Sequence, residues 1–172
     1  MQIHTIQSPT FGLALLTVAG LAYAASLNSV DRQFMITAAK TDMTEAHEGE
    51  MAESQAKGAD VKGFAEKIVK DDTEAYGHLI ELAGKTGVSI PRGIDAAKDQ
   101  TIQVLVHLKG GSFDRQFARD EIDANRRALA AFKMEAAHGH DPDVKAYAAK
   151  MIPILERDLH LAEDCAKAAA RS

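Results

Sequence analysis

Four polar residues interrupt the apolar faces of this sequence at points where carboxylate or metal chemistry would be expected. They are Glu45, Asp72, Asn125 and Asp158. Each falls where apolar residues recur at the three-and-four spacing of one helix face. Burying a lone carboxylate is costly, so each acid requires a proton, a polar partner or a metal ion. Oxygen donors of this kind suit Mn²⁺, Fe²⁺, Mg²⁺ or Ca²⁺.

Four long amphipathic segments must position these residues. The periodicity predicts helices over residues 31–57, 60–86, 112–138 and 142–169. Each of the four polar residues lies near the midpoint of its own helix. In an antiparallel bundle with flush ends the midpoints share one level, so we expect the four side chains to converge in one layer.

The predicted connections set the topology of the bundle. Gly58 and Gly139 indicate short turns, which make the first and second helices, and the third and fourth, antiparallel neighbours. Gly87 and Pro91 end the second helix, and the long connection that follows contains a short helix within residues 95–108. The sequence therefore predicts an all-α, ferritin-like antiparallel four-helix bundle over residues 29–171, whose long crossover between the second and third helices carries a short extra helix.

Residues with good capping chemistry are expected to begin the four helices. The first helix is predicted to start at Ser29 or Asp31, and the fourth at Asp141, which is followed by Pro142. The other two predicted caps are Asp60 and Ser112.

The N-terminus has the pattern of a targeting segment. Residues 5–30 carry no charge, residues 11–22 are apolar, and Ala22-Tyr23-Ala24 has the small-x-small form that signal peptidase accepts. We predict a signal peptide over residues 1–24, or alternatively an uncleaved anchor that reaches Leu27. Either form places the folded domain in the periplasm or another extracytoplasmic part of the envelope, with no transmembrane segment beyond this one.

Composition excludes several classes of function. The formal net charge is −5, and the basic residues are interspersed with acidic ones, which argues against a nucleic-acid partner. Cys165 is the single cysteine, so it cannot form an intramolecular disulfide and is expected to be a small buried hydrophobe. The sequence lacks nucleophile-elbow, phosphate-loop and zinc-protease motifs, which favours a non-catalytic protein.

The polar layer permits two interpretations. A ferritin-like di-metal centre uses a glutamate from each of two helices and Glu-x-x-His from the other two. Here helix one carries Glu45-x-x-Glu48, but His47 lies about 200° around the helix from Glu45, and no histidine falls on an inward face. The residues therefore favour a layer that fixes helix register, with acids that share protons or bond to Asn125, Thr41 and Tyr76, or that reach solvent at the rim. If the acids are buried without metal, at least one should have a raised pKa.

The mature chain resembles the domain of unknown function 4142, an exported bacterial family with a ferritin-like bundle. The segments that carry the resemblance are DRQFMITAAKTDMTEAHEGEMA, DVKGFAEKIVKDDTEAYGHLIELAGKTGVSIP, GGSFDRQF and HGHDPDVKAYAAKMIPILERDLHLA. The resemblance implies the fold and an envelope location, and it supplies no reaction. In that family three layer positions usually hold histidine; here they are Asp72, Asn125 and Asp158, whereas Glu45 is kept. If relatives bind metal there, this chain has lost every imidazole and retains donors for a harder, carboxylate-bound ion only.

Two functions from different classes follow. The first is a non-catalytic envelope protein with a structural or binding role and no cofactor. The second is a metal-binding ferritin-like protein that stores an ion or reacts with it through Glu45, Asp72 and Asp158.

Overall fold

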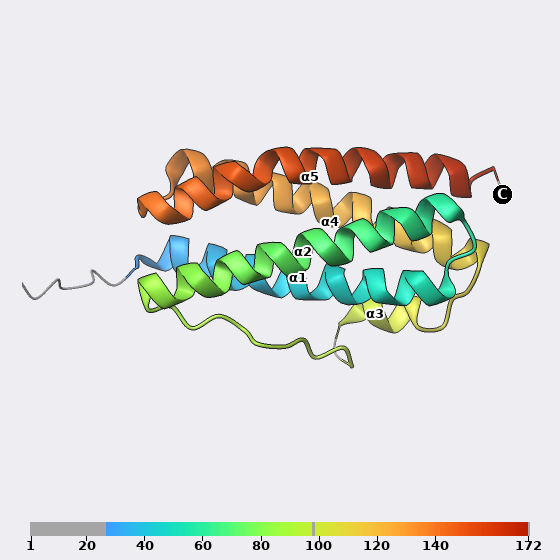
Figure 1. Ribbon diagram of the computed structural model, residues 1–172, viewed down its shortest axis with the longest axis horizontal. Coiled ribbons are helices and arrows are strands. Elements are labelled where there is room, and N and C mark those ends of the chain that lie inside the picture. Colours follow the sequence, from blue (N-terminus) through green and yellow to red (C-terminus); the bar gives the residue numbers. More distant parts are fainter. Residues whose placement is uncertain (1–26, 98, 172) are drawn as a thin grey trace, which may run out of the picture.

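The computed structural model describes residues 27–97 and 99–171, and the predicted signal peptide over residues 1–24 lies outside them. The described residues form five helices and no strand (Figure 1). The helices are α1 Ser29–Gln55, α2 Ala59–Thr86, α3 Gln100–Leu105, α4 Gly111–His138 and α5 Pro142–Ala169. The predicted all-helical class is confirmed, and each long helix begins and ends within two residues of its predicted bounds.

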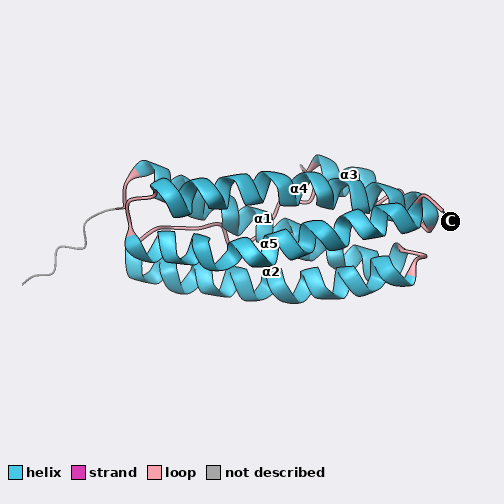
Figure 2. Ribbon diagram, turned by 90° about the horizontal axis from the view of Figure 1, so that it is seen from above, coloured by secondary structure: helices cyan, strands magenta, loops and turns pink. Residues whose placement is uncertain are grey.

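The four long helices pack lengthwise as two hairpins. Helix α1 packs closely along α2, and α4 along α5, whereas α1 meets α4 and α2 meets α5 over smaller surfaces. The crossover after α2 runs back along the bundle to α3, which contacts both α1 and α4 (Figures 1 and 2). In this way the chain reaches the opposite end of the bundle before α4 begins.

The ends of the helices differ in part from the predicted caps. The side chain that caps α1 is Asn28, which accepts hydrogen bonds from the backbone N–H of Val30 (2.7 Å) and Asp31 (3.0 Å). The prediction of Asp141 as the cap of α5 is confirmed, because its carboxylate accepts the N–H groups of Asp143 and Val144. Gly87 ends α2 in the left-handed conformation at φ 69°, where a residue without Cβ is favoured.

The predicted caps of α2 and α4 are wrong. The residues before these helices are Gly58 and Gly110, so Asp60 and Ser112 lie inside the first turns. The turn between α1 and α2 is held instead by Asp114 of α4. Its two carboxylate oxygens accept the backbone N–H groups of Lys57 (3.0 Å) and Gly58 (2.9 Å).

The hydrophobic core is divided into two clusters along the bundle. One cluster contains Phe34, Phe132 and Tyr147, whose rings meet with centroids 4.8 Å to 6.4 Å apart. The other contains Phe64, Phe117 and the buried Cys165. The middle turns of α1, α2, α4 and α5 lie between the two clusters, and the predicted polar residues lie on these turns.

The α1–α2 hairpin depends on a close approach at Gly49. A Cβ built there would lie 2.8 Å from Val69 Cγ2 and 3.1 Å from the Ala65 carbonyl oxygen. Small residues at such positions allow two helix backbones to approach each other.

Among the described residues, no helix is both long enough and apolar enough to span a bilayer.

Candidate functional site

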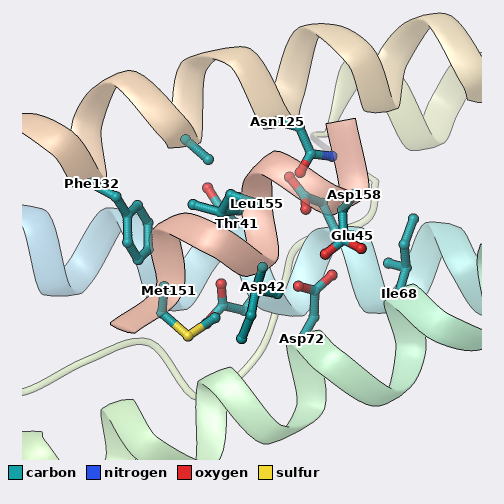
Figure 3. Close-up of a pocket in the computed structure, with 12 residues that line it drawn as sticks. Thr41, Asp42, Glu45, Ile68, Asp72, Asn125, Phe132, Met151, Leu155 and Asp158 are labelled. Atoms are coloured by element: carbon teal, nitrogen blue, oxygen red, sulfur yellow. The ribbon is translucent and has the colours of Figure 1, made fainter. Parts of the chain in front are cut away.

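The structure brings the four predicted polar residues together around one small cavity. Glu45, Asp72, Asn125 and Asp158 all line it, one from each long helix. Figure 3 shows the carboxyl groups of Glu45, Asp72 and Asp158 turned toward one another. The cavity measures about 10 Å³, which is room for about one water molecule or a monatomic ion.

Three further acids belong to the same level and were not placed in the layer by the sequence argument. Asp42 lines the cavity beside Glu45, while Glu48 and Glu121 are buried one turn away from Glu45 and Asn125. Asp42 and Glu48 flank Glu45 at three residues, and Glu121 precedes Asn125 by four. The spacing of neighbours on a helix face would therefore have found them.

Hydrogen bonds within the protein satisfy only part of this layer. The Asn125 side-chain amide donates to the Glu121 backbone carbonyl (3.0 Å) and to Glu121 Oε2 (3.4 Å). Four buried carboxyl oxygens have no hydrogen-bond partner: Asp42 Oδ2, Glu45 Oε1, Asp72 Oδ2 and Glu121 Oε1.

The predicted bond from Tyr76 to the layer is wrong. The Tyr76 hydroxyl donates instead to the Pro91 carbonyl (2.8 Å) and so ties the crossover to α2.

A cation lies at the α2–α5 edge of the layer. The Arg157 guanidinium donates to Asp158 from Nε (3.0 Å) and Nη2 (2.9 Å), and Nη2 also pairs with Asp71. Lys67 pairs with the same Asp71 carboxylate at 3.1 Å. Arg157 is partly exposed, so solvent screens its charge and it offsets the acids only at this edge.

The model of the family described as "Domain of unknown function (DUF4142)" matches residues 16–165. The chain belongs to the DUF4142 family. The match confirms the family that the helix motifs indicate. No curated protein matches the chain.

A solved structure has the same fold as this DUF4142 protein. It is the crystal structure of a DUF305 fragment from Deinococcus radiodurans, which aligns with a TM-score of 0.71 and 15% identity. The alignment covers 86% of this chain and 100% of the fragment. At this identity the likeness concerns the helical fold alone.

Burial makes the carboxyl groups of this layer weaker acids than ordinary glutamate and aspartate side chains. It raises the pKa of Glu45 to about 7 and that of Glu48 to about 8, and neighbouring carboxylates add to both shifts. Burial, and next the nearby Glu45 carboxylate, raise the pKa values of Asp42, Asp72 and Glu121 well above their usual range. Burial also raises the pKa of Asp158, although Arg157 opposes the shift. Near neutral pH the interior of the layer therefore carries bound protons.

The donor set of the layer consists of oxygen atoms alone. The histidines predicted to lie off the inward faces do so, with His47 next to Glu50, His78 next to Glu81 and His160 next to Glu163 on outer surfaces. Across residues 27–97 and 99–171, no three His, Cys, Asp or Glu side chains are spaced to hold one metal ion. A cation could bind here only if the carboxyl groups turned toward it.

Proposed function

We propose that this DUF4142 protein is an exported, non-catalytic component of the bacterial cell envelope. In this proposal it is a ferritin-like four-helix bundle with a structural or binding role, and its mid-bundle carboxyl layer is held neutral by protons. The size of the central cavity carries the proposal. At about 10 Å³ it has room for a water or an ion beside the acids and none for an organic substrate.

A protonated layer has a structural use at this position. Because the layer separates two hydrophobic clusters, sliding one hairpin by a helical turn would move its acids into apolar surroundings. That change would cost the polar contacts of several buried groups. The layer therefore fixes the register of the α1–α2 hairpin against the α4–α5 hairpin, as single polar residues do in coiled coils.

Carboxyl-detected NMR tests this proposal. The ¹³C shifts of Glu45 and Glu48 are followed from pH 4 to pH 9 without divalent cations, with the exposed Glu53 as an internal reference. We expect midpoints near 7 for Glu45 and near 8 for Glu48. Midpoints near 4.5 for both buried acids would contradict the neutral layer.

The unpartnered oxygens favour one second candidate, a site for a hard divalent cation. In this reading the carboxylates of Glu45, Asp72 and Asp158 would hold the ion, and the Asn125 carbonyl oxygen would complete the set. An ion would replace the protons and give a partner to Glu45 Oε1 and Asp72 Oδ2, which have none within the protein. Donors of this type suit Mn²⁺, Fe²⁺, Mg²⁺ or Ca²⁺.

Elemental analysis separates the two candidates. Protein purified without chelator is analysed before and after loading with Mn²⁺ or Fe²⁺ at pH 8, beside D72N and E53Q variants. One equivalent of metal that is lost in D72N and kept in E53Q would support the cation site. Metal far below one equivalent after loading would remove this candidate and leave the proton-bound layer.

The export part of the proposal rests on the N-terminal sequence. Cleavage after Ala24 would leave a mature chain that starts at Ala25. Intact mass spectrometry of the protein recovered from a periplasmic fraction should give the mass of residues 25–172. The full-length mass in a membrane fraction would indicate the uncleaved anchor, and full-length protein in the cytosol would contradict export.

A further inference from the structure

One end of the bundle collects an excess of cations. It is formed by three segments, which are residues 57–62 between α1 and α2, residues 107–115 between α3 and α4, and residues 164–171 at the end of α5 (Figure 1). Although the formal net charge of the chain is −5, these segments carry twice as many lysines and arginines as aspartates. We call this surface the basic end. Its cations are Lys57, Lys62, Lys109, Arg115, Lys167 and Arg171.

Hydrogen bonds hold the three segments of the basic end together. The Gly110 N–H donates to the Gln55 carbonyl at 2.8 Å, and a Cβ built at Gly110 would lie 4.0 Å from Lys57 Cβ. The Cys165 thiol donates to the Asp60 carbonyl at 3.5 Å, which attaches the end of α5 to the start of α2. The cations therefore share one surface, although they are interspersed with acids in the sequence.

The acids of the basic end offset its cations only in part. All of its lysines and arginines are exposed except Lys62, which is half-buried. Asp114 is buried, and its carboxylate faces the backbone N–H groups of the α1–α2 turn. Asp164 pairs with Lys167 at 2.9 Å, and Asp60 is the third aspartate of these segments. The charge that this end presents to solvent is therefore positive.

The opposite end of the bundle is balanced in charge. Residues 29–32, 85–92 and 135–145 form that end, and there the lysines and arginines equal the aspartates and glutamates in number. The bundle is therefore electrostatically asymmetric along its length. An asymmetry of this kind directs one end of a protein toward an anionic surface.

Two valines are exposed beside the cations. Val104 of α3 is 48% exposed, and Val106, which follows α3, is 47% exposed. Val106 precedes Lys109 by three residues, while Ile102 and Leu105 bury the other face of α3. Exposed aliphatic side chains next to cations fit the interface of an anionic bilayer. A small soluble anion offers no apolar region for them.

We propose that the basic end binds the surface of an anionic phospholipid bilayer, with its lysines and arginines against the phosphates and Val104 and Val106 at the acyl boundary. A bilayer presents many phosphates in one plane, which suits cations spread over three segments. Each cation near such a surface strengthens binding about fivefold. The choice of a membrane partner rests on the proposed envelope location, whereas the binding is a property of the folded domain.

Sedimentation with vesicles of two compositions tests the proposal. The full chain is mixed with vesicles of phosphatidylglycerol and phosphatidylcholine in equal amounts, and with vesicles of phosphatidylcholine alone. The neutral vesicles measure binding that does not depend on lipid charge, including any contribution of residues 1–24. We expect at least about tenfold tighter binding to the anionic vesicles, and loss of the difference in about 0.5 M NaCl. Equal binding to both compositions at low salt would overturn the proposal.

Charge-matched variants locate the binding surface. K57Q/K109Q removes two exposed cations from the basic end, whereas K40Q/K85Q removes two exposed cations elsewhere, so both variants have the same net charge. We expect K57Q/K109Q to weaken binding to the anionic vesicles about 25-fold and K40Q/K85Q to weaken it less than about twofold. Equal weakening, with both variants folded by circular dichroism, would mean that net charge alone acts and would overturn the proposal.

The valines distinguish a bilayer from other sources of phosphate. V104S/V106S should weaken binding to the anionic vesicles about fivefold, because less apolar surface enters the interface. I80S changes a similarly exposed aliphatic residue of α2 and should leave binding unchanged. Wild-type affinity in V104S/V106S, or displacement of the protein by inorganic phosphate at constant ionic strength, would indicate an anion site instead of a bilayer surface.

The vesicle experiments are independent of the export test. Binding that follows the lipid charge and the basic-end variants supports the proposal in whichever compartment the protein is found. Absence of that pattern overturns it even where intact mass shows cleavage after Ala24 and export.

Discussion

The carboxyl groups of Asp31 and Glu135 lie close enough to share a proton at the end of the bundle where α1 begins and α4 ends. Asp31 is fully buried and also accepts the backbone N–H groups of His140 (3.1 Å) and Asp141 (2.7 Å). Burial opposes ionisation of Asp31, but these N–H groups outweigh it and lower its pKa. The shared proton therefore belongs to Glu135, whose pKa is raised to about 7 by burial and by Asp31.

This acid pair predicts a pH-dependent connection between α1 and the α4–α5 turn. The folded-state pKa of Glu135 lies above its usual 4.5, so its contribution to stability is complete below about pH 4.5 and is lost as pH rises through 7. In E135Q the amide donates to Asp31 at every pH, and we expect a smaller loss of stability between pH 6 and pH 8. Urea unfolding at each pH measures this slope.

The exposed Glu53 provides the control for that measurement. E53Q removes one carboxylate of the same type from a site with no buried partner and should leave the slope between pH 6 and pH 8 as in the wild type. An E135Q slope equal to the wild-type slope would mean that the proton between Asp31 and Glu135 has no energetic role.

The carboxyl layer predicts a second, larger pH effect on stability. The pKa values of Glu45 and Glu48 are raised to about 7 and about 8, so the folded state binds more protons than the unfolded state between pH 4.5 and pH 8. The free energy of unfolding should therefore fall as pH rises through this window, by on the order of 3 kcal/mol for each fully buried group. Thermal unfolding from pH 5 to pH 8.5 measures the trend.

Replacement of one layer acid provides the matched test. E45Q keeps the size of the side chain and removes its titration, so its Tm should fall less between pH 5 and pH 8.5 than the wild-type Tm. At pH 5, where the acid is already neutral, the two proteins should unfold at similar temperatures. A wild-type Tm that is flat or rises across the range would refute a layer of raised pKa values.

The elements predictable from the sequence were those set by local periodicity. The spacing of apolar residues located all four long helices, and the position of Glu45, Asp72, Asn125 and Asp158 on them was enough to place these residues around one cavity. Helix geometry links each residue only to neighbours three and four positions away, and this information was sufficient because the helices have similar lengths and their turns are short.

Partners that lie far apart in sequence could not be predicted in the same way. Asp31 meets the α4–α5 turn 109 residues away, and Asp114 meets the α1–α2 turn 57 residues away. Both acids stand in the first turn of a helix, where an acid is ordinarily explained by the helix dipole. Their roles depend on how the hairpins pack, and no local pattern contains that information.

The close contact at Gly49 predicts that an alanine there lowers the free energy of unfolding. An added Cβ would meet Val69 Cγ2 at 2.8 Å, so we expect G49A to destabilise the protein by about 1–3 kcal/mol through overpacking. Gly63 lies in α2 with nothing within 4 Å of an added Cβ, and G63A should stabilise by about 0.5–1 kcal/mol through helix propensity. Urea unfolding measures the free energy of unfolding of both variants. A stabilising G49A would mean that α1 and α2 pack less closely at Gly49 than a 2.8 Å contact requires.

Asp114 provides the prediction that most clearly separates long-range capping from local capping of α2. Its carboxylate is buried and holds the N–H groups of Lys57 and Gly58, so D114A leaves two donors without a partner and should cost about 2 kcal/mol or more. Asp60 has the local sequence of a cap but lies inside the first turn of α2, and D60A should cost less than about 1 kcal/mol, the helix-dipole contribution alone. Unfolding free energies of both variants in urea decide between the two, because a cap at Asp60 would reverse their order.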